Sequence, residues 1–590
     1  MVAAKKADFA GIGTQLDIDP VIVRIMRNRG MTEVAQMRAF LRKDETAVHD
    51  PGLLPDMAKA VDIILDKLSS QAKIRIIGDY DVDGVTSTTI LYKGFRALGA
   101  DISYAIPNRV TDGYGINEAM IEKAHEDGID TIVTCDNGIA AVDAIRAAKG
   151  YGMTVVVTDH HEVPYTDNDG VRTYIYPEAD ALIDPKIQDC GYPYSGICGA
   201  MVAFKFMCAL NKRILSTDAQ ADGGALPGPI PEELMEEMSE LAALGTVCDV
   251  MELTDENRAI VSRALKTMKN SRNIGIRALR RVSGTGDKAV AVHELGFIIG
   301  PCINATGRLD SADLSVELLL AEDMDEALLK ATELKNLNDL RKSYTEDGEK
   351  AALRMIEEEH MTDDKVMILY LPDLHESLAG IVAGRIKEDY YRPTIVFTDS
   401  EDGIKGSGRS IEGYNMYDEL NKCRELYTRF GGHAMAAGLS MPKENLETFR
   451  AAVRENCSLT EDELTPKIVI DVPMPMGYVT ENLIGQLTLL EPFGTGNPSP
   501  IFADKGLKIL SLREMGKTGD MCKIRAEGAS GGYFELIMFR GYERLKEEAT
   551  KLTGSPDPTG LTMDAIYYPD INEYNGRRSI QYIIKDYRVS

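Results

Sequence analysis

The sequence predicts an α/β protein with a parallel β-sheet as its catalytic core. Three stretches carry this prediction: Lys73–Ser87 (KIRIIGDYDVDGVTS), Thr131–Gly138 (TIVTCDNG) and Thr154–His161 (TVVVTDHH). Each is a short apolar run, typical of a buried strand, that ends abruptly in acidic residues. Helical patterns at Glu118–Glu126 and Val142–Lys149 separate the three runs. Strands that alternate with helices form a parallel sheet with right-handed crossovers.

The acidic residues that follow these strands predict a metal site. Ligands bind beyond the carboxyl ends of parallel strands, so side chains at those ends can meet at one site. Asp79, Asp81 and Asp83 are spaced two apart and repel one another unless a cation lies between them. A single Asp-rich cluster is usually a surface turn. The agreement of several clusters favours a metal site, with candidate ligands Asp79, Asp81, Asp83, Asp136, His160 and, from the apolar stretch Leu241–Leu253, Asp249.

Five carboxylates and one imidazole form a hard, oxygen-rich ligand set that suits two divalent ions rather than a zinc–thiolate site. Mixed oxygen and nitrogen ligands favour Mn²⁺, with Mg²⁺ as the physiological competitor. Two ions about 3.5–4 Å apart activate a bridging water and hold a phosphate for in-line attack. The predicted chemistry is therefore hydrolysis of a phosphoester or phosphoanhydride. No GxxxxGK[ST] loop is present, so ATP-driven work is not indicated.

Length and composition indicate a multidomain protein of the cytoplasm. The chain has 590 residues, of which 44% are hydrophobic and 27% charged, and three or four domains are expected. No run of about 18 apolar residues occurs, and the first residues lack the apolar core of a signal peptide. The nine cysteines are scattered without a CxxC motif, which is typical of reduced thiols in a cytoplasmic protein.

The net charge of −27 argues against a nucleic-acid partner, but the charge distribution argues for one. The segment Arg258–Arg281 carries eight cations in 24 residues and no acid. A solvated helix face is the simpler explanation of a charged stretch. In so acidic a chain, an unbroken basic segment favours contact with a phosphate backbone.

Pattern changes along the chain predict five parts. They are an N-terminal helical segment (1–50), a catalytic α/β domain (51–322), one or two long connecting helices (323–360), a smaller α/β domain (361–457) and a β-rich domain (463–590). Within the catalytic domain, Asn211–Pro231 is rich in Gly, Pro, Ala and Asp and predicts a surface loop. Short strands and glycine turns in the last part indicate a small barrel or sandwich, and a barrel resembling an OB-fold is the interpretation that fits the function.

Three glycine-rich stretches are weaker candidates for phosphate binding. Gly403–Ser410 (GIKGSGRS) and Phe430–Ser440 (FGGHAMAAGLS) are predicted to form tight turns whose backbone N–H groups bind an anion, beside Arg409 and His433. Gly300–Leu309 (GPCINATGRL) offers Asn304 and Arg308. Close backbone packing explains such glycines equally well.

The ordered motifs resemble a known family. GDYDVDG, TCDNG, TDHH and GTVCDVMEL resemble the four motifs of the DHH phosphoesterases, and GSGRS with FGGHAMAAG resembles the associated DHHA1 domain. Together with GYG at Gly113–Gly115, NATGRL and EPFGTGNPSP at Glu491–Pro500, they make the chain similar to the RecJ family of single-strand exonucleases from about residue 10 to the end.

The resemblance implies Mn²⁺- or Mg²⁺-dependent 5′→3′ degradation of single-stranded DNA to 5′-mononucleotides in DNA repair and recombination. It assigns Asp79, Asp81 and Asp136 to one ion, and Asp83, Asp136, His160 and Asp249 to the other. His161 would face the scissile phosphate, and Asp159 would orient an imidazole.

The resemblance also implies a DNA cleft between the DHH and DHHA1 domains, and a C-terminal barrel that feeds the strand by electrostatics and base stacking. The residues that it implies for nucleic-acid binding are Asn304, Arg308, Ser407, Arg409, Ser410, Gly432 and His433. Single-stranded DNA is the expected partner, with a single-strand-binding protein and a helicase as possible protein partners, no membrane, and a monomer as the default state.

Two departures from the family pattern bear on DNA affinity. Cys302 stands where the family commonly has Arg, and Glu376 adds a carboxylate where a Trp-His-Gly-Val pattern is expected. The main alternative function is a DHH phosphodiesterase for short oligoribonucleotides or cyclic dinucleotides. A pyrophosphatase and an inert scaffold are further alternatives. The length of the chain and its barrel argue against a small substrate, and the complete ligand set argues against a scaffold.

Overall fold

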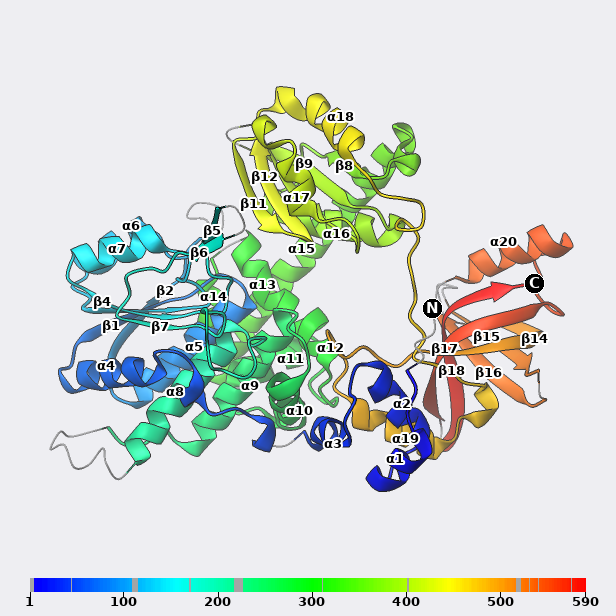
Figure 1. The fold of residues 1–590 in the computed structure, drawn as a ribbon, viewed down its shortest axis with the longest axis horizontal. Helices are drawn as coiled ribbons and strands as arrows, with labels where there is room; N and C mark the ends of the chain where they lie inside the picture. Colours follow the sequence, from blue (N-terminus) through cyan, green and yellow to red (C-terminus); the bar gives the residue numbers. More distant parts are fainter. Residues whose placement is uncertain are drawn as a thin grey trace. The chain divides into compact units, whose positions relative to one another are not determined.

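The structure, a computed structural model, forms two compact units (Figure 1). It describes residues 5–43, 45–108, 115–168, 171–216, 227–309, 311–400, 403–515, 521–529, 531–539, 541–574 and 576–590. The smaller unit comprises residues 1–48, 252–263 and 467–590, and the larger comprises 49–251 and 264–466. The first two residues of the GYG motif and the middle of the predicted 211–231 loop, residues 217–226, lie outside the described residues.

The larger unit contains the predicted parallel sheet. Its strand order is β2-β1-β3-β4-β7, and every neighbouring pair is parallel. The strands are β1 (Lys73–Ile77), β2 (Asp101–Ala105), β3 (Thr131–Cys135), β4 (Thr154–Thr158) and β7 (Ala181–Ile183). Cys135 pairs with Thr158, and Thr158 pairs with Ile183, so these strands end at the same level. The register therefore brings the residues that follow the strands to one edge.

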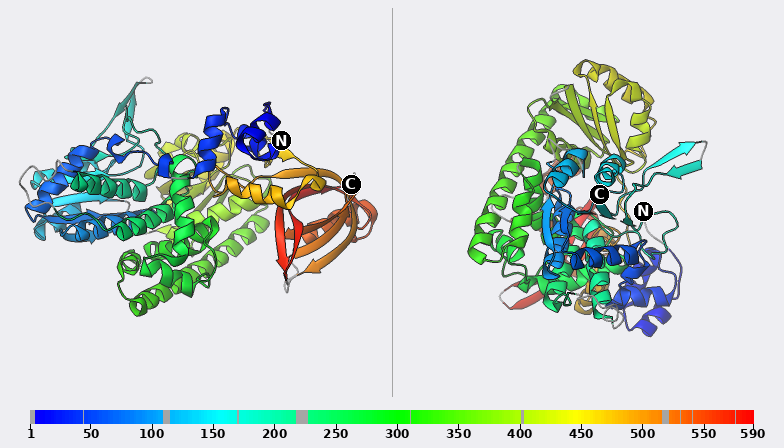
Figure 2. Two further views of the ribbon diagram at one scale, coloured as in Figure 1. Left: turned by 90° about the horizontal axis from the view of Figure 1, so that it is seen from below. Right: turned by 90° about the vertical axis from the view of Figure 1, so that its left-hand side faces the viewer.

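Helices cover both faces of this sheet (Figure 1). On one face, α6 (Glu118–Glu126) and α7 (Val142–Gly150) pack a core that includes Ile121, Ile145 and Val155. The two helices have the limits predicted from the sequence, within one residue. On the other face, Phe95 of α5 (Val82–Ala97) meets Phe206 of α8 (Gly199–Leu215) edge to face. The small hairpin of β5 (Tyr165–Asn168) and β6 (Val171–Tyr174) stands out from the sheet in Figure 2.

The other helices of the larger unit that precede its second sheet cover the parallel sheet or follow it along the chain. They are α4 (Met57–Ser69), α9 (Glu232–Cys248), α11 (Ile274–Val282), α12 (Val292–Glu294), α13 (Gly300–Leu309), α14 (Asp313–Leu320) and α15 (Met324–Glu358). With 35 residues, α15 is one continuous helix about 50 Å long. It fulfils the expectation of a long connecting helix.

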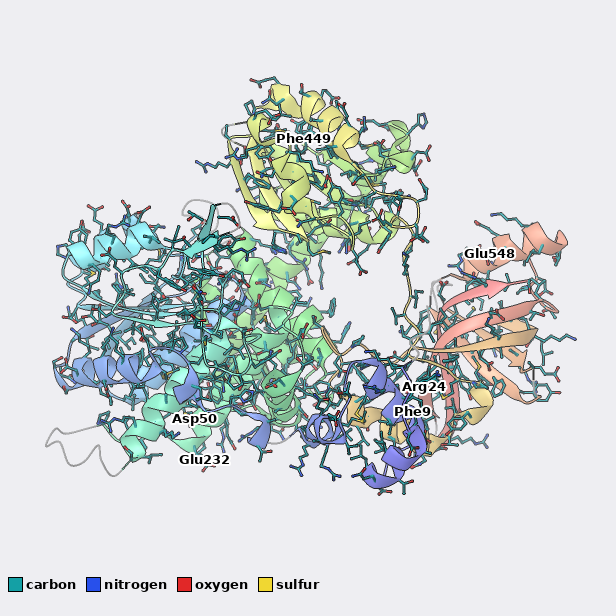
Figure 3. All side chains as sticks on the ribbon, viewed as in Figure 1. Phe9, Arg24, Asp50, Glu232, Phe449 and Glu548 are labelled. Carbon is teal, nitrogen blue, oxygen red and sulfur yellow. The ribbon has the colours of Figure 1, made fainter. Side chains whose placement is uncertain are left out.

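The second sheet of the larger unit has the order β11-β12-β10-β9-β8. Only β8 and β9 run parallel. Its elements are β8 (Met367–Tyr370), α16 (Ala379–Tyr390), β9 (Thr394–Ser400), β10 (Gly403–Arg409), α17 (Met416–Asn421), β11 (Arg429–His433), β12 (Ala436–Met441) and α18 (Leu446–Asn456). Phe449 of α18 (Figure 3) packs edge to face on Phe397 of β9, with ring centroids 5.6 Å apart.

The prediction of a tight turn is wrong for the first glycine-rich stretch of this sheet, and in the second stretch the turn lies at residues 434–435 rather than at the glycines. Gly403–Arg409 is strand β10, and the second stretch consists of β11 and β12 around a short turn. A Cβ at Gly406 would lie 2.5 Å from the ring of Phe397. Close packing, the alternative explanation, therefore accounts for this glycine.

The smaller unit combines the two ends of the chain. Its strands are β13 (Val472–Pro473), β14 (Phe502–Met515), β15 (Met521–Glu527), β16 (Tyr533–Phe539), β17 (Thr562–Tyr574) and β18 (Arg577–Val589). They follow the order β13-β14-β15-β16-β18-β17, and a further β14–β17 pairing closes the ring. This closed, β-rich barrel is the architecture predicted for the C-terminal part, although the predicted strand KIVIDV contributes only its last residue, Val472, to β13.

The N-terminal helices belong to the same core as the barrel. The described helices of this unit are α1 (Phe9–Leu16), α2 (Pro20–Asn28), α3 (Val34–Arg42), the first nine residues of α10 (Asp255–Thr267), α19 (Glu481–Leu487) and α20 (Tyr542–Thr553). Ile22 and Met26 of α2 are fully buried in one cluster with Leu487 and Phe502. Arg24 of the same helix lies over the ring of Phe9 (Figure 3). No helix in the described ranges is long and apolar enough to cross a lipid bilayer.

Candidate metal centre and nucleic-acid contacts

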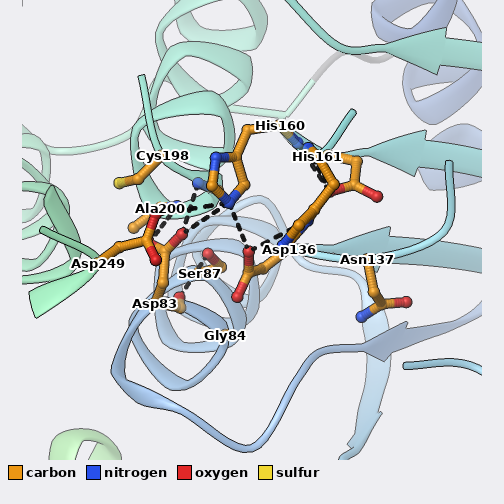
Figure 4. A network of polar contacts seen from close by, with 12 residues as sticks. Asp83, Gly84, Ser87, Asp136, Asn137, His160, His161, Cys198, Ala200 and Asp249 are labelled. Atoms are coloured by element: carbon orange, nitrogen blue, oxygen red, sulfur yellow. Dashed lines mark hydrogen bonds and ion pairs between the residues drawn. The ribbon is translucent and has the colours of Figure 1, made fainter. Parts of the chain in front are cut away.

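The predicted metal ligands converge beyond the carboxyl ends of the parallel strands. Figure 4 shows four of them: Asp83, Asp136, His160 and Asp249. Asp79 comes two residues after β1, Asp136 directly follows β3, and His160 comes two residues after β4. Asp249 is the C-cap of α9, so the candidate ligand of the fourth motif lies at the end of a helix rather than of a strand. Asp79, Asp136 and His160 are almost completely buried.

His160 lies at the centre of one group of ligands. Its Nε2 atom is 3.1 Å from Asp136 Oδ1, 3.6 Å from Asp83 Oδ2 and 3.7 Å from Asp249 Oδ2. Asp83, His160 and Asp249 form one candidate cation site. Burial lowers the pKa of His160, which keeps the ring neutral and its nitrogen lone pair available.

A second group lies around the first motif. Asp79, Asp81 and Asp136 each place one carboxylate oxygen within 4.8 Å of the others. Asp81 is the N-cap of α5 and accepts hydrogen bonds from the N–H groups of Asp83 and Gly84 at 2.9 and 3.1 Å. Asp136 lies beside both groups, as expected of a shared ligand.

Local backbone features bring these acids close together. The N–H groups of Gly199 and Ala200, at the start of α8, donate to the two oxygens of Asp83 at 2.6 and 2.9 Å. A Cβ at Gly199 would lie 2.7 Å from the Cβ of Asp136, so only glycine permits this approach. Asp136 itself has a left-handed backbone with φ of 60°.

The electrostatics of the cluster fit divalent cations. Burial, followed by the charges of neighbouring carboxylates, raises the pKa of Asp79 and of Asp249 to about 8 and raises the pKa of Asp81 and Asp136 as well. Asp79 Oδ1 and both ring nitrogens of His160 are buried without a hydrogen-bond partner among the described residues. Buried carboxylates and an unsatisfied imidazole are stabilised when a cation lies between them. The residues present therefore fit a metal centre.

Asp159 holds His161 next to this cluster. Asp159 Oδ1 lies 2.7 Å from His161 Nδ1 and also accepts a hydrogen bond from the N–H of His160 at 2.7 Å. Burial opposes the charged imidazolium, but the hydrogen bond and charge of Asp159, with the other carboxylates, raise the pKa of His161 to about 9. Burial alone would raise the pKa of Asp159, but the hydrogen bond and charge of His161 outweigh burial and lower that pKa. The predicted orienting contact is therefore present.

Two residues of this edge were missed by the sequence reasoning. Asp184 follows β7, is fully buried and accepts a hydrogen bond from the N–H of Lys186 at 2.7 Å. Burial, and then the charge of Asp159, raises the pKa of Asp184 to about 7. The Lys186 ammonium pairs with Glu162, directly after His161, at 3.2 Å. The sequence does contain a signal for Asp184, because Ala181–Asp184 (ALID) is another apolar run that ends in an acid.

Asn304 and Arg308 lie on helix α13 rather than in a turn. Asn304 Oδ1 accepts a hydrogen bond from the N–H of Val82 at 3.1 Å, which fixes the segment between Asp79 and Asp83. Arg308 donates to the carbonyl oxygen of Ser377 at 2.6 Å. Both predicted residues therefore brace backbone segments.

The predicted residues of the second sheet gather at one end of it. Arg409 and His433 both pair with Ala436, from opposite sides, so one strand separates them. Arg409 donates to Ser407 Oγ at 3.4 Å, and a Cβ at Gly380, near the start of α16, would lie 2.7 Å from its guanidinium.

His433 is exposed, whereas Ser410 is buried and donates its hydroxyl to the carbonyl of Tyr414 at 2.6 Å. Gly432 has φ of 150°, and a Cβ there would lie 2.4 Å from the carbonyl oxygen of Ala436. Ser410 and Gly432 thus have packing roles in the structure.

The two departures from the family pattern have structural partners. Glu376 forms an ion pair of 3.1 Å with Lys405 of β10, which neutralises the added carboxylate. Cys302 is buried in α13, and its sulfur accepts a hydrogen bond of 3.4 Å from Asn338 of α15.

The basic segment Arg258–Arg281 is divided between buried and exposed cations. In the smaller unit, Arg258 lies 3.8 Å from the ring centroid of Phe40 and donates to the carbonyl of Leu489 at 3.0 Å. In the larger unit, Arg280 is buried and paired with Glu294 at 2.6 Å. For these two residues the expectation of phosphate contact is wrong, because packing uses their guanidinium groups. The exposed cations are Lys266, Lys269, Arg272, Arg277 and Arg281.

Comparisons with known proteins agree with this arrangement. Residues 73–246 match the DHH family, N-terminal domain, residues 363–459 match the DHHA1 domain, and residues 470–586 match the RecJ OB domain. The single-stranded-DNA-specific exonuclease RecJ of Bacillus subtilis is 34% identical over 98% of this chain and 69% of its own length. That of Escherichia coli is 33% identical over 96% of each chain.

A solved structure shows the same fold. The crystal structure of RecJ in complex with Mn²⁺ from Thermus thermophilus has a TM-score of 0.79 and 26% sequence identity, covering 100% of this chain and 79% of its own. The motifs, the order of the three domains along the chain and the relatives at about one-third identity lead to one conclusion: the chain belongs to the RecJ family of DHH phosphoesterases.

Proposed function

We propose that this protein is a metal-dependent exonuclease that hydrolyses single-stranded DNA from its 5′ end to 5′-mononucleotides, in DNA repair and recombination. The observation that carries the proposal is the buried cluster of carboxylates around His160, with His161 held beside it by Asp159. The cluster lies in a chain with the DHH, DHHA1 and OB domains of the RecJ family.

We assign two divalent cations to the cluster, Mn²⁺ preferred or Mg²⁺. Asp79, Asp81 and Asp136 would hold one cation. Asp83, His160 and Asp249 would hold the other, with Asp136 shared. When bound, such cations supply a nucleophilic water at neutral pH and positive charge against the phosphate.

His161 has a separate task in this proposal. Because Asp159 holds Nδ1, the other ring nitrogen, Nε2, is the atom that we assign to a phosphate oxygen. With a pKa of about 9, the imidazolium stays protonated near neutral pH and acts as a charged hydrogen-bond donor. Asp159 keeps the ring in position and stabilises its charge.

The strand would be held by the residues of the second sheet and of α13. Arg409 and His433 supply cationic or hydrogen-bonding groups at one end of that sheet, and phosphate contacts of this kind position a strand without reading its sequence. Arg308 and Asn304 hold the segments that frame the site.

The barrel offers a second surface for single-stranded DNA. Tyr533 and Phe539 at the two ends of β16 are 63% and 58% exposed, and Arg525 lies 5.1 Å from the ring centroid of Tyr533. Exposed aromatic rings beside arginine support base stacking of a single strand. The chain has no tryptophan, so tyrosine and phenylalanine must supply this stacking.

We further propose that the protein acts as a monomer in the cytoplasm, with a single-strand-binding protein and a helicase as partners. All nine cysteines are free thiols, as suits a reducing compartment.

Hydrolysis of end-labelled oligonucleotides with Mn²⁺ tests the function. Single-stranded DNA, duplex DNA, RNA and a dinucleotide of matched sequence are compared, with the label at either end. We expect mononucleotides to be released progressively from the 5′ end of single-stranded DNA. Cleavage confined to the dinucleotide would instead identify a phosphodiesterase for small substrates.

A further inference from the structure

A groove of about 770 Å³ runs along the C-terminal half of α15. One wall is formed by Tyr344, Gly348, Ala351 and Met355, whose spacing places them on one face of the helix. The other wall is the segment 370–375, which begins at the end of β8. None of the predicted metal ligands or phosphate contacts lines the groove.

Both walls belong to one packed core, so the groove is a fixed feature of the fold. Ala352 and Ile356 of α15 are buried in the same cluster as Leu369 of β8 and Val382 of α16. A Cβ at Gly348 would lie 2.8 Å from Leu374 and 3.1 Å from Val382, so this glycine allows the close approach of the helix.

The rim of the groove is acidic. Its charged residues are Asp347, Arg354, Glu358, Glu359 and Asp373. Asp347 pairs with Lys350 at 3.6 Å, and Glu359 pairs with Arg450 at 3.5 Å. Glu358 and Asp373 are exposed and form no ion pair with any residue that the structure describes. Arg354, the one cation in this lining, lies on the helical wall, so the rim holds four acids and one cation, and each wall presents one carboxylate without an ion pair among the described residues.

The end of α15 adds to this negative potential. Glu357 and Glu358 are the last two residues of the helix, Glu359 is its C-cap, and its last turn contains no basic residue. Acidic side chains at a helix C-terminus are repelled by the negative end of the helix dipole, whereas cations are stabilised there. A cation from another molecule would relieve this repulsion.

We propose that this groove binds a segment of another protein that is apolar on one side and carries Lys or Arg on the other. Apolar side chains would occupy the trough over Gly348, Ala351 and Met355, and the cations would meet Glu358 and Asp373. An apolar groove along a helix with a charged rim is a common binding site for amphipathic segments. The acidic rim disfavours nucleic acid, so this surface is distinct from those proposed for DNA.

Fluorescence anisotropy with a labelled peptide tests the proposal on the full chain. The probe is an amphipathic peptide about four helical turns long, with Leu on one face and Lys elsewhere. Glu358→Lys/Asp373→Lys should weaken binding at least about tenfold. The matched control, Glu333→Lys/Glu346→Lys, makes the same charge change at exposed α15 glutamates outside the groove and should leave binding within about twofold. Exonuclease activity should be unchanged in both variants.

Two further measurements locate the peptide. Bound peptide should slow hydrogen exchange in residues 344–355 and 370–375, and Ala351→Trp, which fills the trough, should also weaken binding at least about tenfold. A peptide that fails to saturate the wild type, an equal loss in the control, or equal binding of a peptide with Glu in place of Lys would overturn the proposal. Self-association that Glu358→Lys/Asp373→Lys abolishes would also overturn the proposal, because the groove would then bind a second copy of this chain. Competition by oligo(dT) would overturn it as well, because the groove would then bind DNA.

Discussion

The two sheets of the larger unit bring the predicted site residues together in different ways. In the parallel sheet, the strand ends align in register, so Asp79, Asp136 and His160 meet although they are far apart in sequence. In the second sheet, antiparallel pairing with Ala436 brings Arg409 and His433 to the same end, with one strand between them. In a parallel sheet the residues that follow all the strands lie at one edge, whereas in an antiparallel sheet the residues that become neighbours depend on the register of each strand pair, which is set by packing.

The largest expected effect breaks the parallel-sheet site. Asp136→Asn should reduce hydrolysis by about 10³-fold or more, because both proposed cation sites lose a shared ligand. Initial rates on single-stranded DNA at saturating Mn²⁺ measure the effect. Asp143→Asn, at an exposed residue of α7 paired with Arg146, is the matched control and should be close to wild type. Substantial activity of Asp136→Asn would contradict the two-cation assignment.

The same cluster predicts that metal affinity depends on pH. Asp79 and Asp249, with pKa values of about 8, hold protons in the metal-free protein at neutral pH, and a cation must displace them. Affinity for Mg²⁺ should therefore rise with pH, by about tenfold per unit per displaced proton, and level off above about pH 8. Titration calorimetry in buffers of different ionisation enthalpy measures the released protons. An affinity that stays constant between pH 6 and 8 would contradict this electrostatic account.

The sequence predicted the parallel sheet well where apolar runs were long and buried. All of β3 is buried, and its pattern was visible, whereas β2 is an edge strand with partly exposed residues and β7 has only three residues. Both were missed, since hydrophobic periodicity is weak in short or edge strands. Asp184, at the end of β7, was missed with its strand.

Long-range packing explains most of the other differences. Nothing local in the sequence shows that Ile22 and Met26 share a core with the distant barrel. Likewise, Arg258 and Arg280 were indistinguishable from their exposed neighbours, because burial of a cation depends on carbonyl and carboxylate partners supplied by other segments. The glycines of β10 and β12 fit strands as well as turns, and packing decided between them.

A smaller effect is expected from the residues at the end of the second sheet, Arg409 and His433. Arg409→Ala should lower kcat/KM on single-stranded DNA by about tenfold, mostly through KM, because a phosphate contact positions the strand. Arg429→Ala removes a guanidinium from the other end of β11 and serves as the control. Steady-state kinetics on a single-stranded oligonucleotide distinguish the two variants. An equal change in both would mean that the cluster of Arg409 and His433 has no special role.

The smallest effect is expected at the ion pair of Glu376 and Lys405, where a carboxylate is neutralised by a cation of the second sheet. Since Lys405 neutralises Glu376 at 3.1 Å, Glu376→Gln should tighten binding of single-stranded DNA by no more than about threefold. Lys405→Ala should weaken it by a similar factor, because it removes a cation and leaves the carboxylate uncompensated. Lys422→Ala, which breaks the exposed pair with Glu419, is the control. In a double-mutant cycle measured by DNA binding, the two changes should be non-additive. Strict additivity would mean that Glu376 acts on the strand independently of Lys405, as an uncompensated negative charge.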